Sequence, residues 1–394
     1  MMTIKIINEG ENKMRISYYN FLYPYSEELI TIYNSKTGAM ANLDKHHYRL
    51  YNLLEKNNVP IEDEIFVNNL KKGGFVIDDN YCELDDIRFE SLKGKFLSHN
   101  LVLVIAPTND CNFRCPYCYE KDYIAPNYIT EEVENSIIEF VMKVSESLTS
   151  IQVTWYGGEP MLAFRSIEKI TEKILKICED KNIKYDASII TNGYLLKKEY
   201  VMKFKNLKIH SIQVTLDGNR EVHNLRRPHK NNLPTFDVIL DNLVTIKEFL
   251  TSKVALRVNI DKSNLNSIKE VEEIIQSKGL NNFVQVYLGK IMDVNNYYNN
   301  ASCYQNDEFA EIQRKFDFES KNASERIVAF YPKPQRNVCA ADYCNSIVID
   351  ADGKMYKCYT DIGNDSCSFG NIKNLKDINP ELFMIIRPTV LRTA

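Results

Sequence analysis

The sequence predicts an α/β protein: a partial (β/α)6 barrel, preceded by a small α+β unit of winged-helix type and followed by a short C-terminal β-hairpin region. Three observations predict this fold. From Leu101 onward, apolar strand-like runs alternate with amphipathic helical patterns. Three cysteines follow the first of these runs directly. A hairpin pattern with a cysteine near each end comes after the last repeat.

Residues 1–95 are expected to form the first unit. A strand-like run at Leu29–Tyr33 precedes two helical patterns, at 45–55 and 61–71, and the turn Gly73-Gly74 then leads into another strand. This order is typical of a winged helix, with the charged residues 83–99 as a link to the next unit. The unit either caps the barrel or recognises a peptide by adding it to a sheet edge.

Residues 96–320 are expected to form the barrel. The expected strands are continuously apolar, which is typical of a parallel sheet covered by helices on both faces. In such sheets the catalytic residues lie at the carboxyl ends of the strands. Residues 289–335 read as a connector with a helix near 307–319, and residues 321–394 form the C-terminal region. The expected strands are 101–107, 151–156, 186–191, 211–216, 254–260 and 283–288, and the expected helices begin at Thr130 and near 166, 235 and 265.

The composition excludes several classes of protein. The chain has 394 residues, 44% hydrophobic and 26% charged, with a formal net charge of −4. This balance, without a basic block, argues against nucleic acid as a partner. The N-terminus has no apolar signal segment, and no apolar run approaches the length of a membrane span, about 18 residues. We therefore expect a cytoplasmic protein without a membrane partner.

The strongest motif is Cys111-Asn112-Phe113-Arg114-Cys115-Pro116-Tyr117-Cys118, a C-x3-C-x2-C loop. Ten cysteines in a chain expected in a reducing compartment indicate metal binding or catalysis more than disulfides. A structural zinc site needs four ligands and a ferredoxin needs a fourth cysteine, whereas this loop supplies Cys111, Cys115 and Cys118. Three thiolates suit a [4Fe–4S] cluster that leaves one iron open for a small molecule.

This loop, after the first strand of a six-strand β/α pattern, resembles the radical S-adenosylmethionine (SAM) superfamily. The resemblance implies that the open iron binds SAM and that the cluster cleaves it to a 5′-deoxyadenosyl radical, which abstracts hydrogen from a substrate. Gly157-Gly158-Glu159-Pro160, after the second strand, matches the family's GGEP motif, which binds the SAM amino group.

The same resemblance assigns further residues at the strand ends. Thr191-Asn192-Gly193 is similar to the family's TNG turn, so Asn192 is a candidate SAM contact. Thr215-Leu216-Asp217-Gly218 and the following His223-Asn224-Leu225-Arg226 resemble the S/T-x-D-G and H-D-x-x-R patterns of peptide- and protein-modifying members. Thr215 would then contact the SAM carboxylate and Asp217 would be catalytic, while Asn224 replaces an aspartate. Two arginines, Arg226 and Arg257, are candidate cofactor contacts.

The C-terminal cysteines resemble the opening of the SPASM domain, which binds auxiliary [4Fe–4S] clusters. Cys339, Gly353 and Cys358 fit its C-x(9–15)-G-x4-C pattern, and both cysteines are candidate ligands. The remaining cysteines of a full SPASM domain do not follow, so either the chain is truncated or the domain is a shortened version that binds one auxiliary cluster. Whether Cys344 and Cys367 are also ligands stays open.

Together these features predict a radical SAM oxidoreductase that modifies a peptide or protein side chain, as in ribosomal peptide maturation. The expected partners are that substrate and an electron donor such as flavodoxin or ferredoxin. Formation of formylglycine, as in anaerobic sulfatase maturases, shares every motif and is the second candidate. The third candidate is a non-catalytic iron–sulfur protein.

Overall fold

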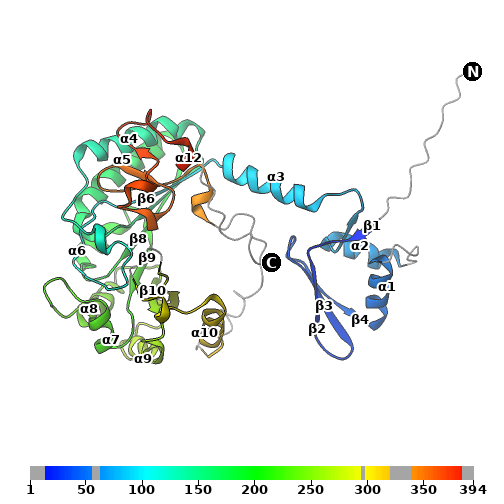
Figure 1. Ribbon diagram of the computed structural model, residues 1–394. Coiled ribbons are helices and arrows are strands. Elements are labelled where there is room, and N and C mark those ends of the chain that lie inside the picture. The colour runs from blue at the N-terminus through cyan, green and yellow to red at the C-terminus, as the bar shows by residue number, and fades with distance from the viewer. Residues whose placement is uncertain (1–13, 56–62, 294–297, 320–338, 384–394) are drawn as a thin grey trace, which may run out of the picture. The chain divides into compact units, whose positions relative to one another are not determined.

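The computed structural model describes residues 14–55, 63–293, 298–319 and 339–383. The chain divides into two compact units. The first contains residues 1–93 and 316–337, and the second contains 94–315 and 338–394. Figure 1 shows the helices and strands of both units in chain order.

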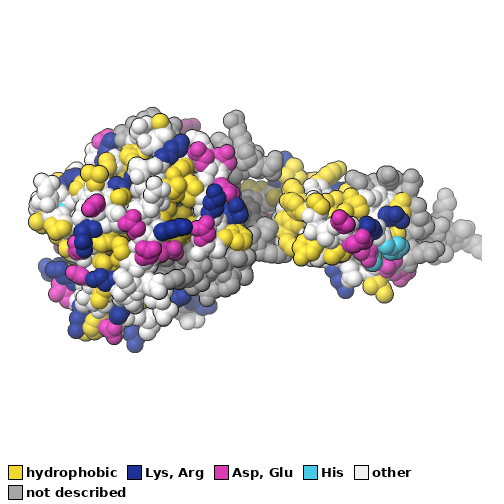
Figure 2. Space-filling model, turned by 90° about the horizontal axis from the view of Figure 1, so that it is seen from below, with side chains coloured by type: hydrophobic (Ala, Val, Ile, Leu, Met, Phe, Trp, Pro, Cys, Tyr) yellow, Lys and Arg dark blue, Asp and Glu magenta, His cyan; other side chains and the backbone are white. Residues whose placement is uncertain are grey.

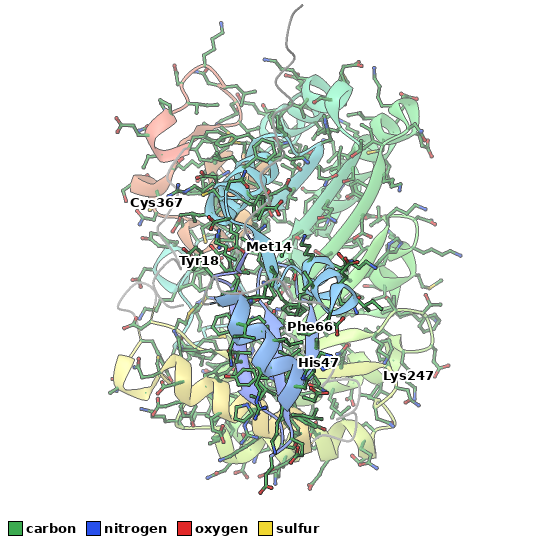
Figure 3. The ribbon with its side chains drawn as sticks, turned by 90° about the vertical axis from the view of Figure 1, so that its right-hand side faces the viewer. Met14, Tyr18, His47, Phe66, Lys247 and Cys367 are labelled. Atoms are coloured by element: carbon green, nitrogen blue, oxygen red, sulfur yellow. The ribbon has the colours of Figure 1, made fainter. Side chains whose placement is uncertain are left out.

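The first unit is built on a three-stranded antiparallel sheet in the order β2-β3-β4. Helices α1 and α2 cover it, and β1 pairs with β5. His47 of α1 lies against Phe66 of α2, with ring centroids 4.7 Å apart (Figure 3). Gly74 (φ 72°) ends α2 in the left-handed conformation that glycine adopts without strain. The elements are β1 (Met14–Ile16), β2 (Asn20–Pro24), β3 (Leu29–Asn34), β4 (Met40–Asp44), α1 (Lys45–Glu55), α2 (Glu64–Gly73) and β5 (Val76–Asp78).

Most of the segment 83–99, which the sequence analysis interpreted as a charged link, forms a helix, α3 (Glu83–Phe96). Glu83, Asp85 and Asp86 lie in its first turn, where negative charge stabilises a helix. The Glu83 carboxylate is buried and accepts hydrogen bonds from the Ser17 hydroxyl and from Arg15. The acidic residues that suggested a linker therefore begin a helix instead.

The second unit contains a nine-stranded sheet in the order β11-β10-β9-β8-β7-β6-β12-β13-β14. Strands β6 to β11 are all parallel, and the sheet stays open. The predicted fold class, an α/β partial barrel, is confirmed. The six strands are β6 (Asn100–Ile105), β7 (Ser150–Trp155), β8 (Lys184–Thr191), β9 (Ile209–Thr215), β10 (Val254–Ile260) and β11 (Val284–Lys290).

Helices follow these strands, and α4 begins where the sequence predicted. The Thr130 side chain accepts a hydrogen bond from the Val133 N–H and caps α4. Two helices of seven residues each, α6 and α7, escaped the sequence analysis because they carry too few turns for a periodic pattern. The helices are α4 (Glu131–Val144), α5 (Phe164–Lys181), α6 (Lys198–Phe204), α7 (Arg220–Arg226), α8 (Phe236–Ile246), α9 (Ile268–Ser277) and α10 (Asn306–Glu319). No described helix is both long and apolar enough to cross a bilayer.

The two faces of the parallel sheet differ in polarity. In β10, Val254, Leu256, Val258 and Ile260 are fully buried, while the residues between them are half-buried. Successive side chains of a strand point to opposite faces, so one face packs under the helices and the other lines the inside of the partial barrel. The inner face carries polar side chains, among them Gln213, Thr215, Arg257, Asn259 and Tyr287.

The C-terminal hairpin continues this sheet. Strand β12 (Ser346–Ile349) pairs in parallel with β6, and β13 (Lys354–Tyr356) turns back along β12. Two-residue β14 (Gly370–Asn371) pairs with β13, and the short helix α12 (Pro380–Phe383) follows. Asp350 holds the turn, accepting hydrogen bonds from the N–H groups of Asp352 and Lys354. The hairpin that the sequence predicted is thus the extension of the barrel sheet.

Candidate active site at the cysteine loop

The cysteine loop lies at the carboxyl end of β6, directly against the GGEP turn that follows β7. The N–H of Glu159 donates to the Asp110 carbonyl at 2.8 Å, and the N–H of Gly158 donates to the Thr108 carbonyl at 3.3 Å. A Cβ at Gly158 would lie 2.2 Å from the Asp110 carbonyl oxygen, and one at Gly157 (φ 99°) would lie 2.7 Å from the Ala106 Cβ. Only glycine allows this approach of the two backbones.

The three thiols of the loop are held by its own backbone. The Phe113 N–H donates to the Cys111 sulfur at 3.4 Å, and the Cys118 N–H donates to the Cys115 carbonyl at 3.1 Å. Burial raises the pKa of all three thiols. Three enclosed sulfurs on one loop, with a backbone N–H already directed at one of them, fit the ligand set of an iron–sulfur cluster. No three His, Cys, Asp or Glu side chains of the described residues converge as ligands of a single metal ion.

Tyr117, between the second and third cysteines, is the centre of a buried hydrogen-bond network. Its hydroxyl donates to Asp217 and accepts from Arg227 at 2.7 Å and from Asn259 at 3.3 Å. Asp217 is fully buried, and its other oxygen accepts from the Asn259 N–H at 3.0 Å. The Asp217 N–H donates to His223 at 3.1 Å. Asp217, predicted as catalytic, therefore fixes the cysteine loop through Tyr117.

Two adjacent arginines have different surroundings. Arg226, the predicted cofactor contact, donates to Asp261 at 3.0 Å and to Ser263 at 2.8 Å, so its contacts tie α7 to the end of β10. Both arginines also lie at the cysteine loop: the Arg226 guanidinium is 5.3 Å from the Tyr117 ring centroid, and the Arg227 guanidinium is 5.7 Å from the Phe113 ring centroid. The positive charge of Arg227 lowers the pKa of the Cys111 and Cys115 thiols, against the larger effect of burial.

Sequence reasoning missed Arg227, although the signal was present. Counted from His223, the pattern H-D-x-x-R ends on Arg227 and not on Arg226. The side chain is 8% exposed, and its Nε reaches no acceptor among the described residues. A buried cation with an unfilled donor beside three thiols fits a negatively charged group at the loop. Asn224 has a structural role, because its side-chain oxygen accepts from Thr235 and from the N–H of Phe236 at the start of α8.

The predicted SAM-binding residues after β7 and β8 are joined to each other. The Glu159 carboxylate is fully buried and accepts from the Thr191 hydroxyl at 2.7 Å, from the Asn192 N–H at 2.8 Å and from the Met161 N–H at 3.1 Å. The Asn192 side chain donates to Asn112 of the cysteine loop at 2.7 Å. Burial raises the pKa of Glu159. The carboxylate thus fastens the GGEP turn to the next strand end, and Pro160 begins the short helical turn after it.

Glu120 is a further site residue that sequence reasoning missed. It follows Cys118 by two residues and is 6% exposed. Burial raises its pKa to about 8, and its Oε1 has no hydrogen-bond partner in the described part of the chain. No motif marks it.

The C-terminal cysteines gather at the open end of the hairpin. Cys344 precedes β12 and Cys358 follows β13, so the pairing of the two strands brings these positions together. Lys357 lies between them and donates to the carbonyls of Tyr343 and Ser346. Burial lowers the pKa of Lys357 to about 8, against the effect of the Cys344 and Cys339 thiols nearby. The geometry thus associates Cys344 with the two predicted ligands.

Cys367 packs against an apolar cluster of Ala106, Val348, Tyr356 and Ile362, on which Val104 of β6 and Tyr156 also pack. Cys178 of α5 is 4% exposed, so it is a core residue, as the sequence predicted.

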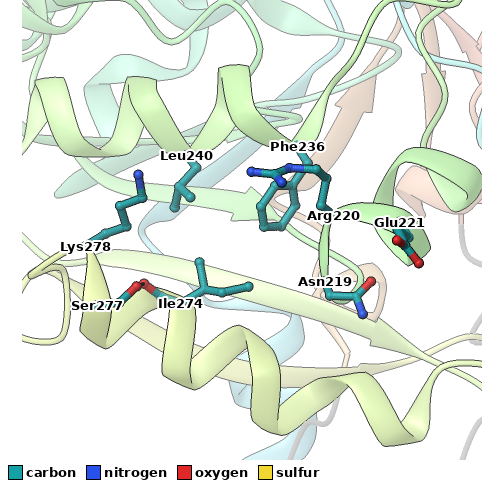
Figure 4. Close-up of a pocket in the computed structure, with 8 residues that line it drawn as sticks. All are labelled: Asn219, Arg220, Glu221, Phe236, Leu240, Ile274, Ser277 and Lys278. Carbon is teal, nitrogen blue, oxygen red and sulfur yellow. Dashed lines mark hydrogen bonds between the residues drawn. The ribbon is translucent and has the colours of Figure 1, made fainter.

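A separate pocket of about 420 Å³ lies in the helical layer, between α8 and α9 beside the start of α7 (Figure 4). Arg220 and Lys278 point into it beside Phe236, Leu240 and Ile274. None of the predicted site residues lines it, and Arg220 is already paired with Asp237. The chemistry-bearing residues converge at the strand ends instead.

Comparisons with known proteins agree with this geometry. Residues 105–275 match the family model of the radical SAM superfamily. The chain therefore contains a radical SAM domain, and the cofactors of such a domain are a [4Fe–4S] cluster and SAM. The matched range contains the cysteine loop, the GGEP turn and the ends of β8 to β10.

Two curated relatives show what this domain resembles. The Fe-coproporphyrin III synthase of Methanosarcina barkeri is 28% identical over 204 residues, which cover 49% of this chain and 47% of that protein. The cysteine-type anaerobic sulfatase-maturating enzyme of Clostridium novyi is 24% identical over 180 residues, covering 44% and 47%. The chain thus spans about half the length of these relatives.

Two solved structures share the fold. The structure named native anSMEcpe with bound AdoMet and Kp18Cys peptide has a TM-score of 0.58 at 22% identity, covering 72% of this chain and 80% of that one. Streptococcus suis SuiB bound to precursor peptide SuiA has a TM-score of 0.53 at 15% identity, covering 94% and 88%. At these identities the likeness concerns the fold.

Proposed function

We propose that this protein is a radical SAM enzyme that removes a hydrogen atom from a side chain of a peptide or protein. The observation that carries the proposal is the backbone hydrogen bonding of the GGEP turn to Thr108 and Asp110, directly before the cysteine loop, at the carboxyl ends of neighbouring parallel strands. Bound together, the cluster and SAM supply a 5′-deoxyadenosyl radical, which does the hydrogen abstraction.

The chain's own residues support this chemistry. Cys111, Cys115 and Cys118 would bind the cluster, and Gly157 and Gly158 keep the turn beside it close. Glu159 and Asn192 fix the position of that turn, while Asp217 holds Tyr117 over the loop. The contacts of Asp217 support a positioning role more than direct contact with a substrate.

Formation of 5′-deoxyadenosine tests this function. Protein reconstituted anaerobically with iron and sulfide should release it from SAM when dithionite is supplied. Cys115→Ala should abolish the release, because the cluster then loses one of its three ligands. Cys82→Ala is the matched control, since Cys82 is exposed and outside the site. If wild-type protein with an assembled cluster released none, the non-catalytic iron–sulfur alternative would stand.

We propose that the first unit recognises the substrate peptide. Apolar side chains gather on one face of this unit (Figure 2). Strand β2 pairs with β3 alone among the described strands, and its Phe21, Leu22 and Tyr23 are 40–55% exposed. An edge strand with exposed apolar side chains suits addition of an extended peptide. The likeness in fold to SuiB, solved with a precursor peptide, supports a ribosomal precursor as the substrate.

Leu22→Pro tests the role of this edge. The Tyr25 N–H donates to the Leu29 carbonyl, and the Tyr19 carbonyl accepts from the Ser35 N–H, so the odd-numbered residues of β2 direct their backbone polar groups towards β3. The N–H of Leu22, an even-numbered residue, therefore points away from β3 to the free edge of the sheet. Proline removes that donor without removing a bond to β3. Peptides selected on the wild-type protein from a random display library should bind Leu22→Pro at least tenfold more weakly, by about the value of one or two hydrogen bonds. Leu22→Ala, the control, should retain most of the binding.

Formylglycine formation remains the second candidate, favoured by the relative of Clostridium novyi. It uses the same cysteine loop and GGEP turn. A peptide with a cysteine in a sulfatase context would be converted under this alternative, whereas a maturase of precursor peptides would leave it unchanged.

A further inference from the structure

Arg257 is an unpaired cation on the inner face of the barrel. It lies in the middle of β10, where alternate residues face inward, and it is half-buried. Its Nε donates to Asn259 at 2.6 Å. Within the described ranges, it makes no ion pair with a carboxylate. Its neighbours on the same face, Gln213, Thr215 and Tyr287, are all neutral.

The neighbouring strand is shaped to admit this side chain. Gly289 of β11 lies beneath the guanidinium, and a Cβ there would be 2.3 Å from the Arg257 Nε and 2.7 Å from its Nη2. Thr215 of β9 is in register with Arg257, so both side chains project from the same face of neighbouring strands. Arg257 therefore has a glycine on one side and a hydroxyl on the other.

The guanidinium of Arg257 lies over a tyrosine of the next strand. Its carbon is 6.0 Å from the ring centroid of Tyr287 in β11, which is in register with Arg257. Arg226 and Arg227, in contrast, lie at the cysteine loop itself: Arg227 donates to the Tyr117 hydroxyl at 2.7 Å, and the Arg226 guanidinium is 5.3 Å from the Tyr117 ring centroid. Arg257 is linked to the loop through Asn259, whose side chain donates to Tyr117 at 3.3 Å.

We propose that Arg257, with Thr215 beside it, binds a carboxylate of the peptide substrate: an Asp or Glu side chain or a C-terminal carboxylate. A guanidinium pairs with a carboxylate through two parallel hydrogen bonds, which fixes orientation as well as position. A half-buried arginine without a carboxylate partner among the described residues is suited to a ligand that brings the anion. The inference rests on the proposed function, since it places the substrate inside the barrel beside the cysteine loop.

A positional-scanning peptide library tests the proposal on the reconstituted holoenzyme, with bound peptide as the readout. Wild-type protein should enrich Asp, Glu or a free C-terminus at one position by about tenfold or more over the matching amide, because hydrogen bonds between charged groups are the strong ones. Arg257→Gln should lose this preference, and Arg257→Lys should keep part of it. Gly289→Ala should also lose it by displacing the guanidinium, and the exposed Arg165→Gln is the control.

The SAM carboxylate is the other source of the same chemistry, and a second measurement separates the two. Arg257→Gln should bind SAM and decarboxylated SAM with the same affinities as the wild-type protein. A loss of affinity for SAM alone would assign Arg257 to the cofactor and overturn the proposal, as would a wild-type library without acidic preference. These readouts need no turnover. Failure to form 5′-deoxyadenosine would therefore refute the proposed function without affecting this result.

Discussion

At the scale of single residues, the site depends on charges that the chain brings together from distant positions. Arg227 is nearly buried and contacts Tyr117, 110 residues earlier in the chain. Burial lowers its pKa, but the anionic forms of Tyr117, Cys115 and Asp217 more than offset this, so its pKa lies well above the ordinary value. Arg227 thus stays positively charged beside the cluster ligands at every accessible pH.

This charge predicts an effect on the cluster's reduction potential. A nearby cation stabilises the reduced, more negative cluster, so Arg227→Gln should shift the midpoint potential to more negative values. Arg227→Lys should restore most of the wild-type potential. The measurement is a redox titration of the reconstituted cluster followed by electron paramagnetic resonance (EPR). Equal potentials in wild type and Arg227→Gln would refute the electrostatic role.

His223 predicts a dependence of stability on pH. Burial, aided by the charges of Arg227 and Arg226, lowers its pKa well below the usual range. Below about pH 6.5, His223 is protonated in the unfolded chain but stays neutral in the folded chain. The free energy of unfolding therefore falls with falling pH, by about 1.4 kcal/mol per pH unit.

His223→Asn should remove this dependence and keep an acceptor for the Asp217 N–H. Urea unfolding of the apoprotein between pH 5 and 7 should show a shallower loss of stability in this variant than in wild type. The exposed His210→Asn serves as the control. Parallel stability curves for wild type and His223→Asn would contradict the assignment.

At the scale of elements, the GGEP turn acts as the support of the cysteine loop. Gly158→Ala would place a methyl group 2.2 Å from the Asp110 carbonyl oxygen, so the turn and the loop must separate. We expect a loss of stability of about 1–3 kcal/mol, typical of overpacking, together with incomplete incorporation of iron. Gly370→Ala is the control, because its nearest atom is 3.3 Å away at the end of a flexible methionine. Full iron content in Gly158→Ala would show that the turn is not a support.

The elements also show where sequence reasoning succeeds. The six parallel strands and the N-cap at Thr130 could be predicted because hydrophobic runs and capping residues are local signals. Helix α3 was read as a linker because the segment is charged, and its apolar residues, such as Phe89 and Leu92, form no clear stripe. Helix α7 was hidden by its length, and with it the position of Arg227.

At the scale of the whole molecule, the sequence predicted the position of the site but not its interactions. The cysteine loop and Gly157-Gly158 could be located because parallel strands bring their carboxyl ends to one edge. The network around Tyr117 could not, because it joins the loop with the ends of β9 and β10 and with α7 through contacts over 100 to 142 residues. The parallel pairing of β12 with β6 is likewise a long-range contact.

The central claim is that Cys111, Cys115 and Cys118 hold a [4Fe–4S] cluster with one iron open to SAM. The most direct test is the EPR spectrum of the reduced cluster in a Cys339→Ala/Cys358→Ala variant, recorded before and after addition of SAM. This variant leaves the cysteine loop intact and removes the two predicted auxiliary ligands. The spectrum should change on addition of SAM, because SAM binds the open iron directly. An unchanged spectrum, with the cluster present at about four irons per chain, would contradict the account.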